Sequence, residues 1–159
     1  MDQIEHKLKV LSQIAKELNQ KKLTWAVGAS LLLYFKGIVT DFHDIDIMVP
    51  EDEIDEVKAV FLSLGIMQPP NPNVTYKTKH FMEFIIEGVE FDIMAGFVII
   101  NHDKAYQFSF TKENIKESVQ INGVKIPLQP LGEWRTYYQL MGREEKLSLI
   151  DAWLQKPLR

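Results

Sequence analysis

The sequence predicts a mixed α/β (α+β) fold, and three observations support this class. Segments with apolar residues at three- and four-residue steps, typical of helices, occur between short runs in which apolar and polar residues alternate, typical of strands. Two of these strand-like runs are divided by a two-residue turn signal, as in antiparallel hairpins. A chain of 159 residues with 46% hydrophobic residues can bury one substantial core. We therefore expect a single domain over residues 1–159.

The first part of the chain is expected to form a helix, a strand, a tight turn and a second helix. Apolar residues from Ile4 to Leu18 fall on one face of a helix. The run that follows is rich in β-forming residues and ends at Gly28. A short helix should then begin near Ser30 and end at Gly37. This segment therefore contains a strand-to-helix turn.

The remaining elements follow from strand alternation, hairpin turns and helix-ending glycines. The segment "HDIDIMV" predicts a second strand, and residues 51–65 predict a helix whose acidic first turn suits the positive end of the helix dipole. Two hairpins are expected, at Glu87-Gly88 and at Asn122-Gly123. Two closing helices are expected on either side of Gly142.

Composition and charge exclude several classes of function. The formal net charge is -4 and the pI is about 5.6, which argues against broad non-specific nucleic-acid binding. The chain has no cysteine, so disulfides, thiolate metal sites and thiol catalysis are excluded. The charged N-terminal residues lack the apolar stretch of a signal peptide or membrane span. We therefore expect a soluble cytoplasmic protein without a membrane partner.

Two carboxylates occupy the second predicted strand. Side chains on a strand alternate between its two faces, so Asp44 and Asp46 point to one side while Ile45 and Ile47 point to the other, toward the core. Two neighbouring carboxylates repel each other, and a divalent cation between them lowers that cost. Because a hard ion such as Mg²⁺ prefers oxygen ligands, the pair predicts a metal site.

A third acid is expected from a later strand. In "VEFDIM" the apolar residues form one face, which places Asp92 on the opposite face together with Glu90. Asp92 is therefore the candidate third metal ligand. Asp41 and His43 lie close to the aspartate pair in sequence, but we interpret them as solvated residues at the strand entrance and keep them outside the predicted site.

Together these motifs resemble the nucleotidyltransferase superfamily, whose fold is shared with DNA polymerase beta. The similarity rests on Gly28-Ala29-Ser30 between a strand and a helix, on "DIDIMV" after a short helix, and on "EFDIM" in a later strand. It includes order and spacing as well as residue type, over roughly the first two thirds of the chain. The resemblance implies an enzyme with a mixed β-sheet flanked by helices.

The resemblance also implies roles for individual residues. In this family a glycine-serine turn holds the triphosphate of a nucleotide, which here corresponds to Gly28 and Ser30; a glycine lets the backbone approach the phosphates closely. Three acids on two strands bind Mg²⁺ or Mn²⁺, which here corresponds to Asp44, Asp46 and Asp92, with Asp92 as ligand or base. The implied activity is transfer of a nucleoside monophosphate from a nucleoside triphosphate to an acceptor hydroxyl, with release of pyrophosphate.

The chain departs from the family pattern in two places. The family turn is usually Gly-Gly or Gly-Ser, whereas here Ala29 follows the glycine. The final helix of the family often has a basic residue followed by acids. This chain has Arg143, Lys146 and Asp151 at a different spacing, which makes Lys146 a weak candidate for triphosphate binding.

Two alternative functions fit parts of the same pattern. One is a non-catalytic nucleotide-binding module of the same fold, although a degenerate site would be expected to lose at least one of the three acids. The other is a glycosyltransferase with an Asp-x-Asp metal site, a class that usually needs a longer chain. The acceptor stays open among a small molecule, a protein and an RNA, as do the preferred base and the oligomeric state.

Three aromatic residues of the penultimate predicted helix have two interpretations. Trp134, Tyr137 and Tyr138 could stack on a base or on an acceptor ring. Packing of the helix against the sheet is the favoured interpretation.

Overall fold

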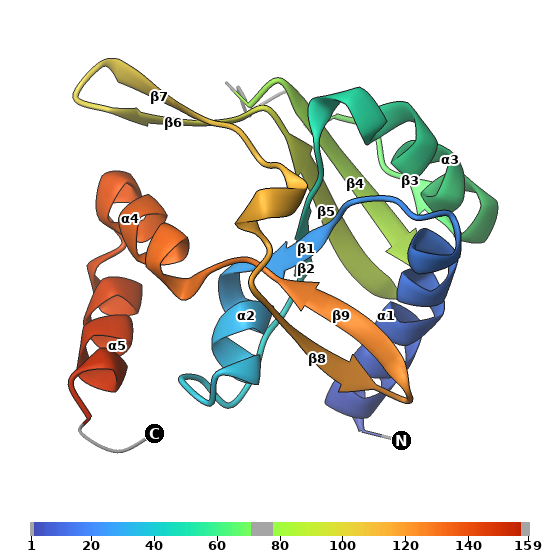
Figure 1. The fold of residues 1–159 in the computed structure, drawn as a ribbon, viewed down its shortest axis with the longest axis horizontal. Coiled ribbons are helices and arrows are strands. Elements are labelled where there is room, and N and C mark those ends of the chain that lie inside the picture. Colours follow the sequence, from blue (N-terminus) through green and yellow to red (C-terminus); the bar gives the residue numbers. More distant parts are fainter. Residues whose placement is uncertain (1, 71–77, 157–159) are drawn as a thin grey trace.

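A computed structural model of the chain describes residues 2–70 and 78–156 (Figure 1). Its main sheet has seven strands in the order β3-β4-β5-β2-β1-β9-β8, and β6 and β7 form a separate two-stranded sheet. Within the main sheet, β1 is parallel to β9 and β2 is parallel to β5, whereas the other neighbours are antiparallel. This arrangement confirms the predicted mixed α/β class.

The helices and strands follow one another as α1 (Gln3–Gln20), β1 (Ala26–Gly28), α2 (Ala29–Phe35), β2 (Ile45–Met48), η1 (Glu51–Glu53), α3 (Ile54–Leu64), β3 (Ile66–Met67), β4 (His80–Ile86), β5 (Val89–Ala95), β6 (Phe97–Asn101), β7 (Lys104–Phe108), η2 (Lys112–Asn114), β8 (Glu117–Ile121), β9 (Val124–Leu128), α4 (Leu131–Met141) and α5 (Glu144–Leu154). Helices α1 and α3 lie on one side of the molecule, and α4 and α5 lie on the other (Figure 1).

Both predicted hairpins are present in the main sheet. The β4–β5 turn has Glu87 at φ 48° and Gly88 at φ 79°, and the β8–β9 turn has Asn122 at φ 52° and Gly123 at φ 76°. Two successive residues with positive φ give a turn whose twist matches that of the flanking strands. The hairpins therefore follow from local backbone chemistry at these four positions.

Helix α1 is fixed at its start and buried along one face. Asp2 caps it, because Asp2 Oδ1 accepts hydrogen bonds from the backbone N–H groups of Ile4 at 2.6 Å and Glu5 at 3.1 Å. Helix α3 packs on the sheet through Phe61, whose ring lies 5.2 Å from that of Phe84 and 5.6 Å from that of Phe91. These contacts cover the sheet face that the predicted carboxylates do not occupy.

The β6–β7 hairpin is an element that the sequence analysis did not predict. Its turn consists of His102 at φ 50° and Asp103 at φ 62°, without the glycine that marks the other two hairpins. Asn101 at the end of β6 donates from Nδ2 to the backbone oxygen of Leu140 at 2.9 Å. This bond joins the hairpin to α4.

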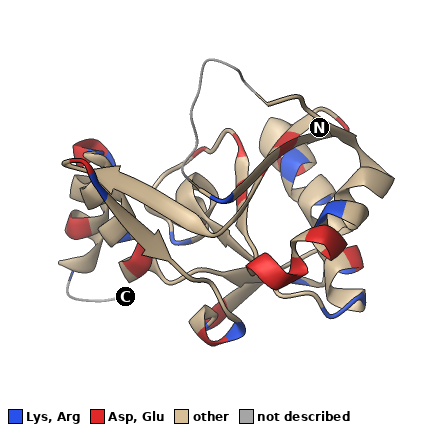
Figure 2. Cartoon of the chain, turned by 90° about the horizontal axis from the view of Figure 1, so that it is seen from above, with Lys and Arg blue, Asp and Glu red and all other residues tan. Residues whose placement is uncertain are grey.

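The buried hydrophobic residues form one continuous cluster that extends from Val10 in α1 to Ile150 in α5. Lys and Arg are scattered among Asp and Glu over the described chain, and η1 is a run of three acids (Figure 2). Among the described helices, none is long and apolar enough to cross a membrane.

Candidate functional site

The register of the main sheet brings three predicted site residues together. Strands β1 and β2 pair with Gly28 opposite Asp46, and β2 and β5 pair with Asp46 beside Asp92. Ile45 and Ile47 are fully buried on the opposite face. Residues that are far apart in the sequence therefore meet because their three strands are neighbours in the sheet.

Asp44 lies outside the strand to which the sequence analysis assigned it. Strand β2 begins at Ile45, so Asp44 occupies a bend directly before it. Its side chain is 34% exposed, yet its Oδ1 atom is buried and has no hydrogen-bond partner among residues 2–70 and 78–156. Its negative charge raises the pKa of both Asp46 and Asp92, so the three carboxylates lie close enough to interact.

Burial and mutual repulsion raise the pKa values of the two strand acids. Burial is the largest cause for Asp46, followed by the charges of Asp92 and Asp44, and the pKa lies well above its usual range. Burial also comes first for Asp92, followed by the charges of Asp44 and Glu83, and its pKa rises to about 7. Glu83 contributes because it stands directly opposite Asp92 in the β4–β5 ladder.

Two further residues approach the acids, and the sequence analysis left both outside the site. His43 Nε2 lies 3.4 Å from Asp44 Oδ1 and 3.6 Å from Glu90 Oε2. A hydrogen bond with Asp44 and the negative charge of Asp44 both raise the pKa of Glu90. Strand alternation had already placed Glu90 on the face of Asp92, so this signal was available in the sequence.

The chemistry of these side chains fits a hard divalent cation. Asp44, Asp46 and Asp92 offer carboxylate oxygens, the donors that Mg²⁺ and Mn²⁺ prefer. The raised pKa values of Asp46 and Asp92 show that their negative charge is poorly balanced by the protein. The buried Asp44 Oδ1 atom accepts no hydrogen bond in the described chain and has His43 Nε2 3.4 Å away. A cation at this position would supply the missing positive charge.

The predicted phosphate turn lies at the junction of β1 and α2, but its glycine has a packing role as well. Gly28 has an extended backbone, φ -131° and ψ -164°, which any residue can adopt. A Cβ atom at this position would overlap Gln129 Oε1 and Trp134 Nε1. The next residue, Ala29, has φ 52°, a strained value for a residue that is not glycine. Ser30 follows in the first turn of α2 and is half-buried.

The three aromatic residues of α4 pack in the core, as the favoured interpretation predicted. Trp134, Tyr137 and Tyr138 are between 3% and 4% exposed, and the ring of Tyr137 lies 5.0 Å from Phe97 and 4.7 Å from Phe108. Burial, then the negative charge of Asp46, raises the pKa of Tyr138 to about 12. Helix α4 therefore borders the acidic site through Tyr138.

The basic and acidic residues near the C-terminus divide between two environments. The Arg143 guanidinium lies 5.9 Å from the centre of the Tyr138 ring, on the side of α4 that borders the acids. Asp151 instead pairs with Arg135, whose Nε donates to Asp151 Oδ1 at 2.6 Å. Asp151 therefore joins α5 to α4. Lys146 is half-buried on α5.

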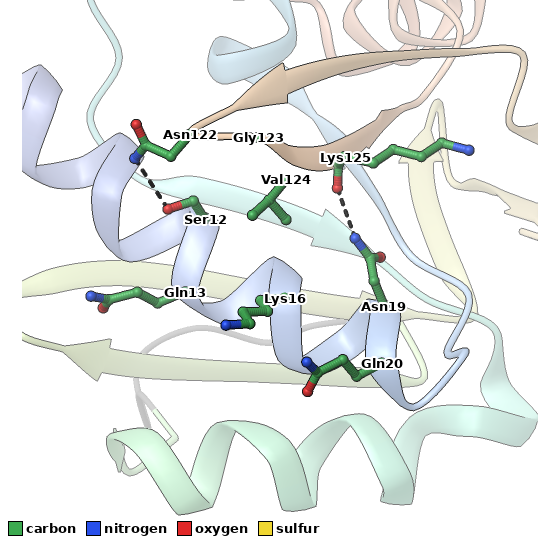
Figure 3. Close-up of a pocket in the computed structure, with 9 residues that line it drawn as sticks. All are labelled: Ser12, Gln13, Lys16, Asn19, Gln20, Asn122, Gly123, Val124 and Lys125. Carbon is green, nitrogen blue, oxygen red and sulfur yellow. Dashed lines mark hydrogen bonds between the residues drawn. The ribbon is translucent and has the colours of Figure 1, made fainter.

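A separate groove of about 550 Å³ lies between α1 and the β8–β9 hairpin (Figure 3). It is lined by polar side chains, and Asn19 Nδ2 crosses it to donate to the backbone oxygen of Lys125 at 2.9 Å. Asn122 Nδ2 bonds Ser12 Oγ at its other end, at 3.4 Å. The groove contains none of the predicted site residues, so we place the candidate site at the acids because of their chemistry rather than at this groove.

Comparison with known proteins identifies a matching family model and similar structures. A family model for aminoglycoside-2''-adenylyltransferase matches residues 10–149. The chain is similar to a candidate nucleotidyltransferase from Thermotoga maritima, with 28% identity, coverage of 97% of this chain and 95% of that chain, and a TM-score of 0.71. No match was found among curated proteins.

Two more distant structures share the fold. One is ANT(2'')-Ia in complex with adenylyl-2''-tobramycin, with 13% identity, coverage of 94% of this chain and 90% of that chain, and a TM-score of 0.63. The other is the lincosamide antibiotic adenylyltransferase LnuA with bound lincomycin, with 14% identity, coverage of 90% and 95%, and a TM-score of 0.58.

Proposed function

Because the chain belongs to the aminoglycoside-2''-adenylyltransferase family and is thus a nucleotidyltransferase, we propose that it transfers AMP from ATP to a hydroxyl group of a small molecule and releases pyrophosphate. The observation that supports this proposal most directly is the placement of Asp46 beside Asp92 in neighbouring parallel strands, with Gly28 opposite Asp46. The family membership removes the glycosyltransferase alternative. A non-catalytic nucleotide-binding module is the alternative that the experiment below decides.

The acids are proposed to serve the reacting end of the nucleotide. Asp44, Asp46 and Asp92 would hold Mg²⁺ or Mn²⁺, which when bound neutralises phosphate charge and lowers the pKa of an acceptor hydroxyl. Asp92 is the candidate base as well as a candidate ligand, because its pKa of about 7 lies near neutral pH. Asp46 is half-buried, and its partial removal from water strengthens its interactions with charged groups.

The turn after β1 is proposed to hold the triphosphate. Backbone N–H groups at the start of α2 and the Ser30 hydroxyl can donate to phosphate oxygens. Gly28 adds no side chain to this approach, and the place of a Cβ atom is taken up by Gln129 and Trp134. The turn and the acids lie on adjacent strands, so one nucleotide can contact both.

A small-molecule acceptor is proposed because of the structural neighbours. ANT(2'')-Ia was solved with an adenylylated aminoglycoside, and LnuA was solved with a lincosamide. Lysines and arginines are interspersed with acids along the described chain (Figure 2), and the formal net charge is -4, a balance that does not favour RNA binding.

The proposal is tested by incubating the chain with Mg²⁺, ATP and a panel of aminoglycosides and lincosamides. We expect pyrophosphate release and a product that is heavier by one AMP. Asp46→Asn and Asp92→Asn should each lower the rate by about 100-fold or more, because each removes a charged group from the reacting centre. Asp55→Asn, an exposed acid on α3, is the matched control and should keep the wild-type rate. ATP binding without pyrophosphate release across the panel would instead identify a non-catalytic module.

A further inference from the structure

Gln129 is a buried polar residue that the proposed mechanism does not yet use. Its backbone N–H donates to the oxygen of Val27 at 2.9 Å, so it extends β9 alongside the strand that ends at Gly28. The residue is only 1% exposed. Buried polar groups normally have hydrogen-bond partners, so it matters which partners this side chain has next to the predicted ligand-binding turn.

The carboxamide of Gln129 is held in one orientation. Trp134 Nε1 donates to Gln129 Oε1 at 2.9 Å, and an indole N–H can only donate, so the amide oxygen must face the indole. The Nε2 group therefore points elsewhere, with two N–H donors. Nε2 has no hydrogen-bond partner in the described part of the chain. Leaving buried donors unpaired lowers stability, so their retention suggests a partner that arrives with a ligand.

The carboxamide lies directly against the predicted phosphate turn. A side chain at Gly28 would overlap both Gln129 Oε1 and Trp134 Nε1, so the amide rests on the Gly28 Cα atom. Gly28 stands opposite Asp46 in the β1–β2 ladder. The Trp134 ring in turn lies 5.3 Å from that of Tyr138, the residue that borders Asp46. The unpaired donors are therefore placed among the groups that are proposed to surround the triphosphate.

We propose that Gln129 is a nucleotide-binding residue whose Nε2 donates to a phosphate oxygen of the triphosphate on the Gly28-Ala29-Ser30 turn. Phosphate oxygens only accept hydrogen bonds, so they require the donor end of the amide, and the bond from Trp134 prevents the amide from turning its oxygen toward them. Because Nε2 is buried, this contact requires the turn or the indole to move enough to uncover it. The inference rests on the proposed function, since it requires a nucleotide at this turn.

Two substitutions test the Nε2 donor of Gln129 separately from the packing of its side chain. Gln129→Glu keeps the size of the side chain and an oxygen for Trp134 Nε1, but replaces the free donor with a negatively charged acceptor. Gln129→Met keeps a similar volume without polar atoms. We expect the Kd for Mg²⁺-ATP, measured by calorimetry, to rise by roughly 10-fold in Gln129→Met, as expected for one lost hydrogen bond to a charged acceptor, and by more in Gln129→Glu. The KM for the acceptor should stay within about two-fold of wild type, since this bond concerns the nucleotide alone.

Controls distinguish this role from a purely structural one. Gln139→Met changes an exposed glutamine of α4 and should leave the Kd unchanged. The double variant Gln129→Met/Trp134→Phe removes both partners of the buried bond, so it should keep a melting temperature close to wild type while binding ATP weakly. In the wild-type chain, the side-chain amide resonances of Gln129 should shift when Mg²⁺-ATP is added, a measurement that needs no variant.

The outcomes are distinct. Wild-type binding with Kd values that agree within about two-fold in all Gln129 variants would overturn this inference and leave the proposed function intact, with a buried water as the partner of Nε2. Absence of binding by the wild-type chain to ATP, GTP, CTP and UTP would overturn the proposed function and this inference together.

Discussion

At the scale of single residues, the candidate site concentrates negative charge that the protein itself does not balance. Asp46 and Asp92 face each other across two strands, with the charges of Asp44 and Glu83 close by. Burying such acids lowers the stability of the fold, and clusters of this kind occur mainly where a ligand or a cation interacts with the charge. The same repulsion makes the site sensitive to pH in a direction that can be worked out.

Without a divalent cation, the chain is expected to become less stable as the pH rises from about 4 to about 7. The folded pKa of Asp92, about 7, lies above its ordinary value of 3.8, and that of Asp46 is also raised. The folded state therefore keeps protons that the unfolded state has released, so the stabilising effect of these protons is complete below the ordinary pKa and is lost as the pH passes the folded pKa. In EDTA, the melting temperature should fall by about 5 °C between pH 5 and pH 8.

Variants test whether this pH dependence of stability comes from the acids of the candidate site. Asp92→Asn cannot ionise, so it should show a smaller fall and should melt above the wild type at pH 8. Asp55→Asn should follow the wild-type curve. Mg²⁺ at pH 8 should raise the melting temperature of the wild type and have little effect on Asp92→Asn. A wild-type curve that is flat or rising over this range would contradict the charge balance derived from the structure.

At the scale of elements, the site depends on how α4 packs against the end of β1. Gly28 has an extended backbone that would accept any residue, so the need for glycine is steric and comes from Gln129 and Trp134. This differs from the sequence-based argument, in which the glycine serves the approach of phosphate. The two roles are compatible, because the side chains that fill the Cβ position lie on the sheet face of Asp46, where the triphosphate is proposed to bind.

Gly28→Ala should therefore destabilise the fold. The added Cβ overlaps a buried indole and the carboxamide of Gln129 that is hydrogen-bonded to it, and overpacking of this kind costs about 1–3 kcal/mol. Gly132→Ala is the matched control, since nothing lies within 4 Å of a Cβ at that helical position. It should be neutral or stabilise by up to about 1 kcal/mol because alanine favours helices. Urea unfolding measures the stability of both variants. If Gly28→Ala were as stable as the wild type, the packing of α4 against the end of β1 would have adjusted to the added Cβ atom without cost.

The elements differ in how well the sequence predicts them, for a physical reason. The hairpins at Glu87-Gly88 and Asn122-Gly123 depend on adjacent residues, so they were predictable. The β6–β7 hairpin was missed because its turn, His102-Asp103, carries no glycine. The order of the strands in the sheet could not be predicted from local sequence patterns, because β1 pairs with β9, about a hundred residues later. This pairing brings Gln129 to Gly28.

The candidate site, too, was predictable from the sequence only in part. Alternation along the strands placed Asp92 on the face opposite the core, and the resemblance to nucleotidyltransferases linked it to Asp44 and Asp46. The start of β2 at Ile45, which leaves Asp44 in a bend, was not predictable, because strand ends depend on tertiary pairing. The approach of His43 to Asp44 and Glu90 follows from that bend.

At the scale of the whole molecule, one core joins the sheet to the closing helices. The buried cluster includes residues of α1, the main sheet, α4 and α5, and the Trp134 to Gln129 hydrogen bond links α4 to the strand layer. A single cluster of this kind supports the proposal that residues 1–159 form one domain. The alternative is that α4 and α5 form a weaker unit, since Ile150 is the buried residue through which α5 packs.

The proposal of one domain predicts a single unfolding transition, which tryptophan fluorescence can test from two sides. Trp25 lies in the core beside β1, whereas Trp134 lies in α4, and both are at most 3% exposed. Variants that keep only one of them, Trp134→Phe/Trp153→Phe and Trp25→Phe/Trp153→Phe, report on the two regions separately. In each variant, the fluorescence midpoint in urea should coincide with the midpoint of far-UV circular dichroism, because α4 cannot leave the core without exposing the aromatic cluster around it. If Trp134 became exposed at a lower urea concentration than that at which the overall secondary structure is lost, α4 and α5 would be a separate unit, and the border of the acidic site would open before the sheet unfolds.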